Sequence, residues 1–124
     1  MGRQVKVLIV DDNSDMRKTL RSVLSDFDCA ITEAETGEDA FEEISKAYFD
    51  VVFFDNKLPK ADGIDIIRQV RESNKAIGKI FLLTGYPEEN TKAEAEGLGV
   101  FHFQNKKDMN LFEIREKFKA AISQ

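Results

Sequence analysis

Charged and hydroxyl side chains follow the apolar segments of this sequence at points where they could act together. Asp11 and Asp12 come directly after one apolar segment, Asp55 and Thr84 end two others, and Lys106 follows the last one. If these segments are neighbouring parallel strands, their carboxyl ends lie at one edge of a sheet, where open α/β folds bind ligands. We therefore expect three carboxylates, a hydroxyl and an ammonium group to meet at that edge.

The chemistry that such a group favours is phosphoryl acceptance on a carboxylate. Crowded carboxylates repel one another, and Mg²⁺, which takes oxygen ligands and shares phosphates, removes the conflict. Three aspartates, one Mg²⁺ and Lys106 sum to zero charge, so the site could accept a phosphoryl group. A carboxylate can be the covalent acceptor, with the metal, Lys106 and the Thr84 hydroxyl each holding a phosphoryl oxygen. Taken singly, each residue is better explained as part of a helix cap, a turn or a solvated surface, and only their joint placement at successive strand ends favours a site.

The elements that would position these residues alternate regularly along the chain. Apolar runs typical of buried strands occupy residues 5–10, 29–33, 51–55, 80–84 and 100–103. Helical periodicity fills the intervals, and the helix expected around residues 88–96 has the fewest apolar positions. This alternation predicts an α/β fold, a (βα)5 doubly wound parallel sheet of five strands with helices on both faces. We expect residues 1–124 to form a single domain, with no output domain in this chain.

Composition excludes several classes of protein. The 124 residues include 18 Lys+Arg and 23 Asp+Glu, a formal net charge of −5, which argues against direct nucleic-acid binding. Residues 1–62 carry 8 basic and 14 acidic side chains, so the acidity belongs to the first half. No apolar run approaches the roughly 20 residues of a membrane span. Cys29 is the sole cysteine and cannot form an internal disulfide, so we expect a cytoplasmic protein.

The sequence resembles the receiver domain of two-component response regulators, the CheY-like superfamily, over essentially its whole length. The Asp-x-x-x-Pro-x-x-x-Gly arrangement from Asp55 to Gly63 is specific to that family, and the spacing onward to Thr84 and Lys106 is family-like. The segments that carry the resemblance are residues 7–13, 50–63, 83–85 and 99–106. The resemblance, rather than the apolar pattern, implies a flavodoxin-like strand order of 2-1-3-4-5.

The resemblance also implies roles for individual residues. Asp55 looks like the phospho-acceptor, and Thr84, Lys106 and Phe103 look like the switch hydroxyl, the phosphate-binding cation and the aromatic toggle. The implied Mg²⁺ ligands are Asp12, Asp55 and the Lys57 backbone carbonyl, with Asp11 acting through water.

The implied function is a signalling switch rather than an enzyme with an external substrate. A sensor histidine kinase or phosphotransfer protein would phosphorylate it, and the face formed by helix 4, strand 5 and helix 5 would change. The downstream target is unknown, homodimer formation on phosphorylation is left open, and neither nucleic acid nor membrane is an expected partner. We expect autodephosphorylation, slowed by the bulky side chains of Lys57 or Tyr86.

One position departs from the family pattern. The family usually has proline after the site lysine, whereas this chain has Lys107, so we expect no cis peptide there.

Two alternatives to the signalling switch stay open. A receiver-like docking module could work without phosphorylation. A Mg²⁺-dependent aspartyl-phosphate phosphatase would need a carboxylate two residues after the nucleophile, where this chain has Lys57. His102 and Cys29 are interpreted as strand residues without a chemical role.

Overall fold

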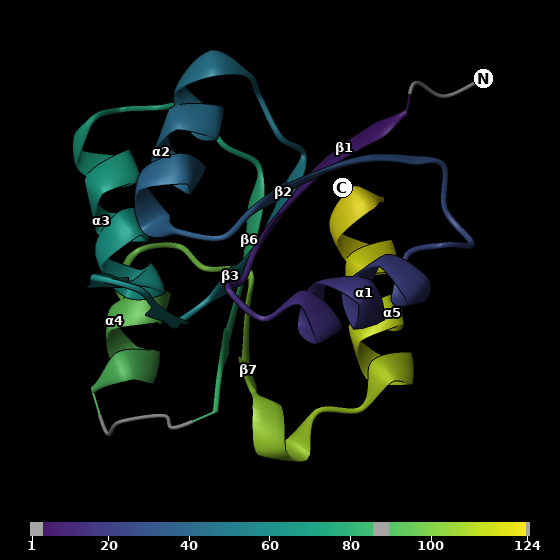
Figure 1. The fold of residues 1–124 in the computed structure, drawn as a ribbon. Helices are drawn as coiled ribbons and strands as arrows, with labels where there is room; N and C mark the ends of the chain where they lie inside the picture. The colour runs from purple at the N-terminus through teal and green to yellow at the C-terminus, as the bar shows by residue number, and fades with distance from the viewer. Residues whose placement is uncertain (1–3, 86–89, 124) are drawn as a thin grey trace.

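The computed structural model describes residues 4–85 and 90–123, which form a sheet covered by helices on both faces (Figure 1). The segment between β3 and α3 adds a small two-stranded hairpin. In chain order the elements are β1 (Val5–Val10), α1 (Ser14–Val23), β2 (Cys29–Ala34), α2 (Gly37–Lys46), β3 (Val51–Asp55), β4 (Lys57–Leu58), β5 (Ala61–Asp62), α3 (Gly63–Glu72), β6 (Lys79–Thr84), α4 (Thr91–Gly97), β7 (His102–Asn105), the 3-10 turn η1 (Lys106–Asp108) and α5 (Leu111–Ile122).

The main sheet within these residues has five parallel strands in the order β2-β1-β3-β6-β7. This confirms the predicted doubly wound architecture and the 2-1-3-4-5 order, with β6 and β7 as the fourth and fifth strands. The register aligns the strand ends: Val10 pairs with Phe54 and Thr84 with Asn105. Asp11, Asp55 and Lys106 therefore leave the sheet at the same edge.

Two hydrophobic cores lie on opposite faces of the sheet, and alternation along the strands assigns side chains to them. Val7 and Ile9 belong to the core beneath α1 and α5. Leu8 and Val10 belong to the core beneath α2, α3 and α4. Figure 1 shows this division of the helices between the two faces. Every residue of β3 is buried, as expected for the central strand of a parallel sheet.

Side-chain caps set the start of several helices. The Asn13 side chain accepts hydrogen bonds from the backbone N–H groups of Asp15 and Met16 at the start of α1. Thr36 and Asn110 cap α2 and α5 in the same way. These caps satisfy backbone donors that have no partner inside the helix. The α1 cap matters most for the site because it ends the loop that carries Asp11 and Asp12.

The predicted boundaries differ from the observed ones near α4 and β7. Strand β7 covers residues 102–105 rather than 100–103, so Val100 and Phe101 precede it. Helix α4 spans Thr91–Gly97, and part of the predicted 88–96 segment lies outside the described residues. No helix in the described part of the chain is long and apolar enough to cross a membrane.

Candidate functional site

Asp11 is held tightly at the end of β1. The residue is 2% exposed, and its Oδ1 accepts a hydrogen bond from the Asn13 N–H at 2.9 Å. Its backbone carbonyl accepts from Arg17 Nη1 at 2.8 Å, and its own N–H donates to the Ala34 carbonyl at 3.0 Å. These contacts fix the loop on both sides of the carboxylate. The next residue, Asp12, is exposed.

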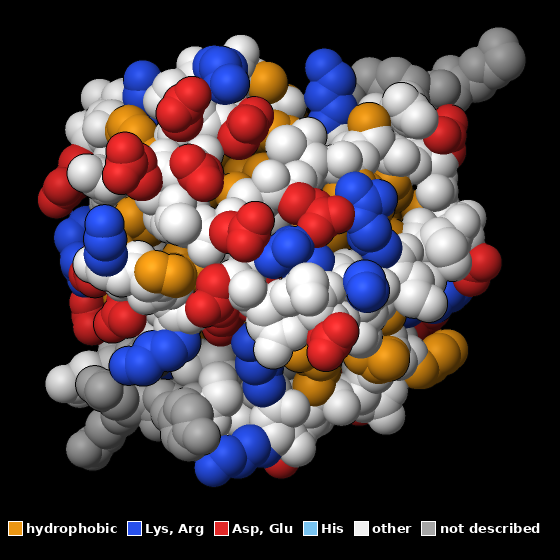
Figure 2. Space-filling view, viewed as in Figure 1, with side chains coloured by type: hydrophobic (Ala, Val, Ile, Leu, Met, Phe, Trp, Pro, Cys, Tyr) orange, Lys and Arg blue, Asp and Glu red, His pale blue; other side chains and the backbone are white. Residues whose placement is uncertain are grey.

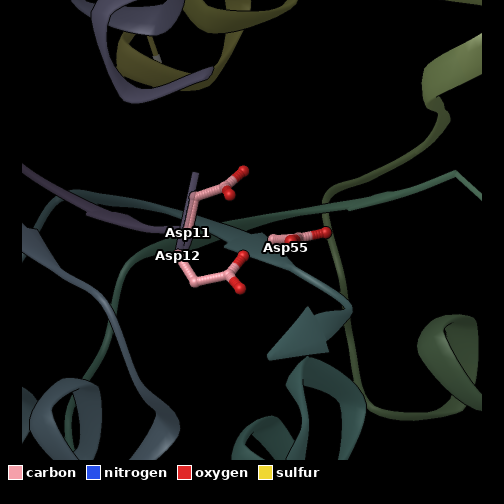
Figure 3. Close-up of side chains that lie close together, drawn as sticks. All are labelled: Asp11, Asp12 and Asp55. Carbon is pink, nitrogen blue, oxygen red and sulfur yellow. The ribbon is translucent and has the colours of Figure 1, made fainter. Parts of the chain in front are cut away.

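Asp55 enters the same space from β3. The residue is 6% exposed, and its Oδ1 accepts a hydrogen bond from the Lys57 N–H at 3.3 Å. Figure 3 shows the Asp55 carboxylate beside those of Asp11 and Asp12, which leave consecutive positions after β1. One carboxylate oxygen from each of the three lies within 4.8 Å of the others. Such a spacing fits shared coordination of one divalent cation by hard oxygen ligands.

Lys106 supplies the counter-charge. Its Nζ lies 3.0 Å from Asp55 Oδ1 and 3.4 Å from Asp11 Oδ2, so one ammonium group contacts both buried carboxylates. The Lys106 side chain is 22% exposed, and solvent therefore still reaches it. With three carboxylates and one ammonium, the cluster keeps a surplus negative charge that a divalent cation would neutralise.

The electrostatic cost of this arrangement falls on Asp55. Burial raises the pKa of the Asp55 carboxyl above its ordinary value, and repulsion by Asp11 raises it further. The Lys106 ammonium and the Lys57 N–H act in the opposite direction, without cancelling the first two effects. A buried carboxylate beside another one favours a bound cation because the cation stabilises both charges. The residues present therefore fit Mg²⁺.

The remaining predicted site residues are placed around this cluster to differing degrees. Thr84 is buried at the end of β6, and Phe103 is half-buried on β7, where it packs against the core beneath α4. Lys57 is exposed on the β4–β5 hairpin that follows Asp55. Tyr86 lies outside the described residues.

Three residues contribute to the site in ways that sequence reasoning did not predict, although Gly63 ends the motif that begins at Asp55. Arg17 holds the Asp11 carbonyl, and its position one turn into the first helix was the available signal. Gly63 packs so closely on β3 that a Cβ there would lie 2.6 Å from the Asp55 carbonyl oxygen. Asn105 accepts a hydrogen bond from the Lys107 N–H at 2.9 Å, next to Lys106. The polar character of the strand end before Lys106 was the signal for this contact.

Comparison with known proteins agrees with this geometry. The model of the response regulator receiver domain family matches residues 7–119, and the chain belongs to that family. Its acidic pocket of Asp11, Asp12 and Asp55 with Lys106 is that of a receiver domain, and the acidic triad is typical of a Mg²⁺-binding receiver site. Receiver domains are phospho-acceptor signalling modules rather than classic enzymes, and they imply a histidine kinase or phosphotransfer partner.

The chain matches nearly the whole length of one relative described here and a smaller part of the others. Sporulation initiation phosphotransferase F of Bacillus subtilis is 31% identical over 118 residues, covering 94% of this chain and 93% of that protein. The transcriptional regulatory protein ResD of the same species is 36% identical over 91 residues, which cover 73% of this chain. The chain spans between 11% and 37% of the length of ResD and five other matched relatives. Among solved structures, a CheY-like receiver domain from Methanospirillum hungatei has a TM-score of 0.84 at 22% identity, covering 98% of this chain and 95% of that one.

Proposed function

We propose that this chain is a phosphorylation-controlled signalling switch in which Asp55 accepts a phosphoryl group from a histidine kinase or phosphotransfer protein. The observation that carries the proposal is the Lys106 ammonium, which contacts Asp55 and Asp11 inside the carboxylate cluster. A nucleophilic carboxylate, a counter-charge and a set of metal ligands thus share one edge of the sheet. Those are the parts that phosphoryl transfer needs, since its catalysis is mainly positioning and electrostatic stabilisation.

In the proposed reaction, an Asp55 carboxylate oxygen attacks phosphorus as the bond from phosphorus to the donor nitrogen breaks. The imidazole of the donor histidine leaves with the bonding electron pair and takes a proton from solvent. Lys106 would move from the carboxylates to one phosphoryl oxygen, and the Thr84 hydroxyl would donate to another. The Lys57 N–H, which now donates to Asp55 Oδ1, is close enough to the acceptor to assist in the same way.

Asp11, Asp12, Asp55 and the Lys57 backbone carbonyl would hold Mg²⁺. When bound, this ion neutralises the surplus negative charge and draws a phosphoryl oxygen toward the acceptor. Asp12 would bind the ion directly and Asp11 through a water molecule, and the exposed position of Asp12 and the buried position of Asp11 fit these two roles.

Phosphorylation would be transmitted through the face formed by α4, β7 and α5. Thr84 ends β6, whose neighbour β7 carries the half-buried Phe103, and the two strands are paired. Helix α4 buries two residues, Thr91 and Ala95, and of these only Ala95 is hydrophobic. A helix that buries little surface shifts at low energetic cost. We propose that turning of Thr84 toward the phosphoryl group and inward movement of Phe103 shift α4, which partners detect.

Incubation with Mg²⁺ and acetyl phosphate, followed by intact mass measurement, tests the phospho-acceptor. Wild type is expected to gain one phosphoryl group and Asp55→Asn none, while a control at the exposed Asp39, Asp39→Asn, gains it as wild type does. Beryllofluoride with Mg²⁺ is expected to shift the amide resonances of α4 and β7 in wild type alone. Absence of both adduct and spectral change would leave a docking module that works without phosphorylation.

We further propose that Lys57 or Tyr86 slows loss of the phosphoryl group by obstructing the attacking water. Lys57 is exposed on the hairpin directly after the acceptor. The measurement is the lifetime of the phosphorylated protein for wild type, Lys57→Ala and Tyr86→Ala. A shorter lifetime is expected for at least one variant, and equal lifetimes for a variant remove its residue from this role.

A further inference from the structure

The residue after the site lysine takes part in a hydrogen bond that a proline could not make. Asn105 Oδ1 accepts from the backbone N–H of Lys107 at 2.9 Å. Proline has no backbone N–H, so this hydrogen bond requires a residue other than proline at position 107. As expected from the sequence, no peptide bond between described residues is cis. The loop after β7 is thus held by Asn105.

This hydrogen bond closes the turn in which Lys106 lies. Asn105 is the N-cap of η1, with φ −79° and ψ 121°, and Lys106 is the first residue of that turn. The turn is completed by the Met109 N–H, which donates to the Lys106 carbonyl at 3.3 Å. Because N-cap side chains stabilise the turn that follows them, loss of the Asn105 side chain loosens the backbone at Lys106.

A second side chain holds the peptide group on the other side of Lys106. Gln104 is buried, and its Nε2 donates to the Asn105 carbonyl at 2.9 Å. The Gln104 Oε1 in turn lies 2.9 Å from His102 Nε2. The Asn105 carbonyl belongs to the peptide that enters Lys106, and the Lys107 N–H belongs to the peptide that leaves it. Both peptide groups that flank Lys106 are therefore fixed by side chains from the end of β7.

We propose that Asn105 is a positioning residue for Lys106, assisted by Gln104. Fixing both flanking peptides fixes the direction in which the Lys106 side chain leaves the backbone. Its ammonium group then reaches Asp55 at 3.0 Å and Asp11 at 3.4 Å. A lysine side chain has several rotatable bonds, so a defined starting direction removes many orientations in which it would miss the carboxylates. This inference rests on the proposed function, because it concerns how the phosphate-binding cation is held.

The test compares four variants at two positions. Asn105→Ala removes the acceptor and Lys107→Pro removes the donor, whereas Asn105→Ser keeps a neutral side-chain oxygen that can cap a turn. Lys107→Ala removes the second ammonium group but keeps the N–H. Asn105→Ala and Lys107→Pro are expected to phosphorylate about fivefold more slowly with acetyl phosphate and Mg²⁺, the size of one lost hydrogen bond. Asn105→Ser and Lys107→Ala are expected to stay near the wild-type rate.

Two further measurements separate positioning from general damage. In a Lys106→Ala background, Asn105→Ala is expected to slow phosphorylation no further, because the group it positions is already gone. In the unphosphorylated protein, the Lys106 ammonium signal in ¹H–¹⁵N spectra is expected to be protected from solvent exchange in wild type and Asn105→Ser but not in Asn105→Ala. This second readout requires no phosphorylation.

Failure of this inference differs from failure of the proposed function. If wild type gains no phosphoryl group, the proposed function fails. If wild type is phosphorylated and Asn105→Ala matches it in both rate and ammonium protection, Asn105 does not position Lys106. A Lys107→Ala rate as low as that of Lys107→Pro would also overturn the inference, since the ammonium group rather than the N–H would then be responsible.

Discussion

Substitution of Gly63 by alanine should damage the site through the backbone of its acceptor residue. Gly63 is the first residue of α3, and its N–H donates to the Asn56 carbonyl at 2.8 Å. A Cβ at this position would lie 2.6 Å from the Asp55 carbonyl oxygen and 3.2 Å from the Asn56 Cα. Ordinary van der Waals contact begins at 3.4 Å. Both neighbours are backbone atoms, so either α3 must move outward or the end of β3 must shift.

The expected loss of stability follows from this overlap. Inserting a methyl group into a packed site costs about 1–3 kcal/mol. The higher helix propensity of alanine over glycine offsets at most about 1 kcal/mol of that cost. For a domain of this size each kcal/mol lowers Tm by about 4 °C. Because the clash falls on Asp55 itself, we also expect phosphorylation to slow about tenfold or more, as small displacements of reacting groups do.

Thermal unfolding and the initial rate of phosphorylation by acetyl phosphate with Mg²⁺ measure the two effects. Ile80 is fully buried at the end of β6 that lies away from Thr84. Ile80→Val should lower the free energy of unfolding by about 0.5–1.5 kcal/mol without slowing phosphorylation of the folded protein. Gly97→Ala, at the last residue of α4, where an added Cβ meets nothing within 4 Å, should leave the phosphorylation rate near wild type and should not lower Tm. A wild-type phosphorylation rate in Gly63→Ala, or an equally strong slowing in Ile80→Val, would show that the contact of Gly63 with Asp55 does not control the site.

Three further predictions concern ionisable groups. Burial and repulsion by Asp11 raise the pKa of Asp55, so the stability of the Mg²⁺-free protein should fall as pH rises through that pKa. Asp55→Asn should therefore be more stable than wild type at neutral pH, and this difference in stability should vanish in acid. Hydrogen bonds from Arg21 and Arg17 lower the pKa of Glu33. Glu33→Gln should therefore lower the free energy of unfolding, measured in urea, by about 0.2–1 kcal/mol at neutral pH. This loss of stability should disappear as pH falls through the lowered pKa. Burial, with a smaller contribution from Asp28, raises the pKa of the Cys29 thiol, so iodoacetamide should alkylate the native protein more slowly than the urea-unfolded protein at pH 8; equal rates would contradict this.

The parts of the fold that the sequence predicted well are those governed by burial. Strands β1, β3 and β6 are nearly continuous apolar runs because helices cover both faces of the sheet, and burial of all five β3 residues agrees with that interpretation. The meeting of Asp11, Asp55 and Lys106 followed from the placement of polar residues at strand ends. This prediction required only the parallel topology and no detail of side-chain packing.

Elements governed by hydrogen bonding and backbone conformation were harder to predict. Val100 and Phe101 are apolar, but Phe101 packs on Phe81 before the strand ladder begins at His102, so β7 starts two residues late. The β4–β5 hairpin turns at Pro59 and Lys60, where Lys60 adopts a φ of 68°. Glycine or asparagine usually marks such a turn, and lysine gave no signal.

The contacts that hold the site together also escaped prediction, because each joins residues whose partners only the folded chain defines. The hydrogen bond from Arg17 to the Asp11 carbonyl requires the exact path of the loop between β1 and α1. The hydrogen bond from the Lys107 N–H to Asn105 is local, but it requires the 3-10 turn that the apolar pattern does not encode. Sequence spacing locates chemical groups at an edge, whereas their support depends on backbone geometry.

The central claim is that Asp55 receives the phosphoryl group. After incubation with Mg²⁺ and acetyl phosphate, borohydride reduces an aspartyl phosphate to homoserine, and peptide mass spectrometry locates the modified position. Modification is expected in the tryptic peptide of residues 47–57, at position 55 and not at Asp50. Modification at Asp11, Asp12 or another carboxylate, or no modification at all, would contradict it.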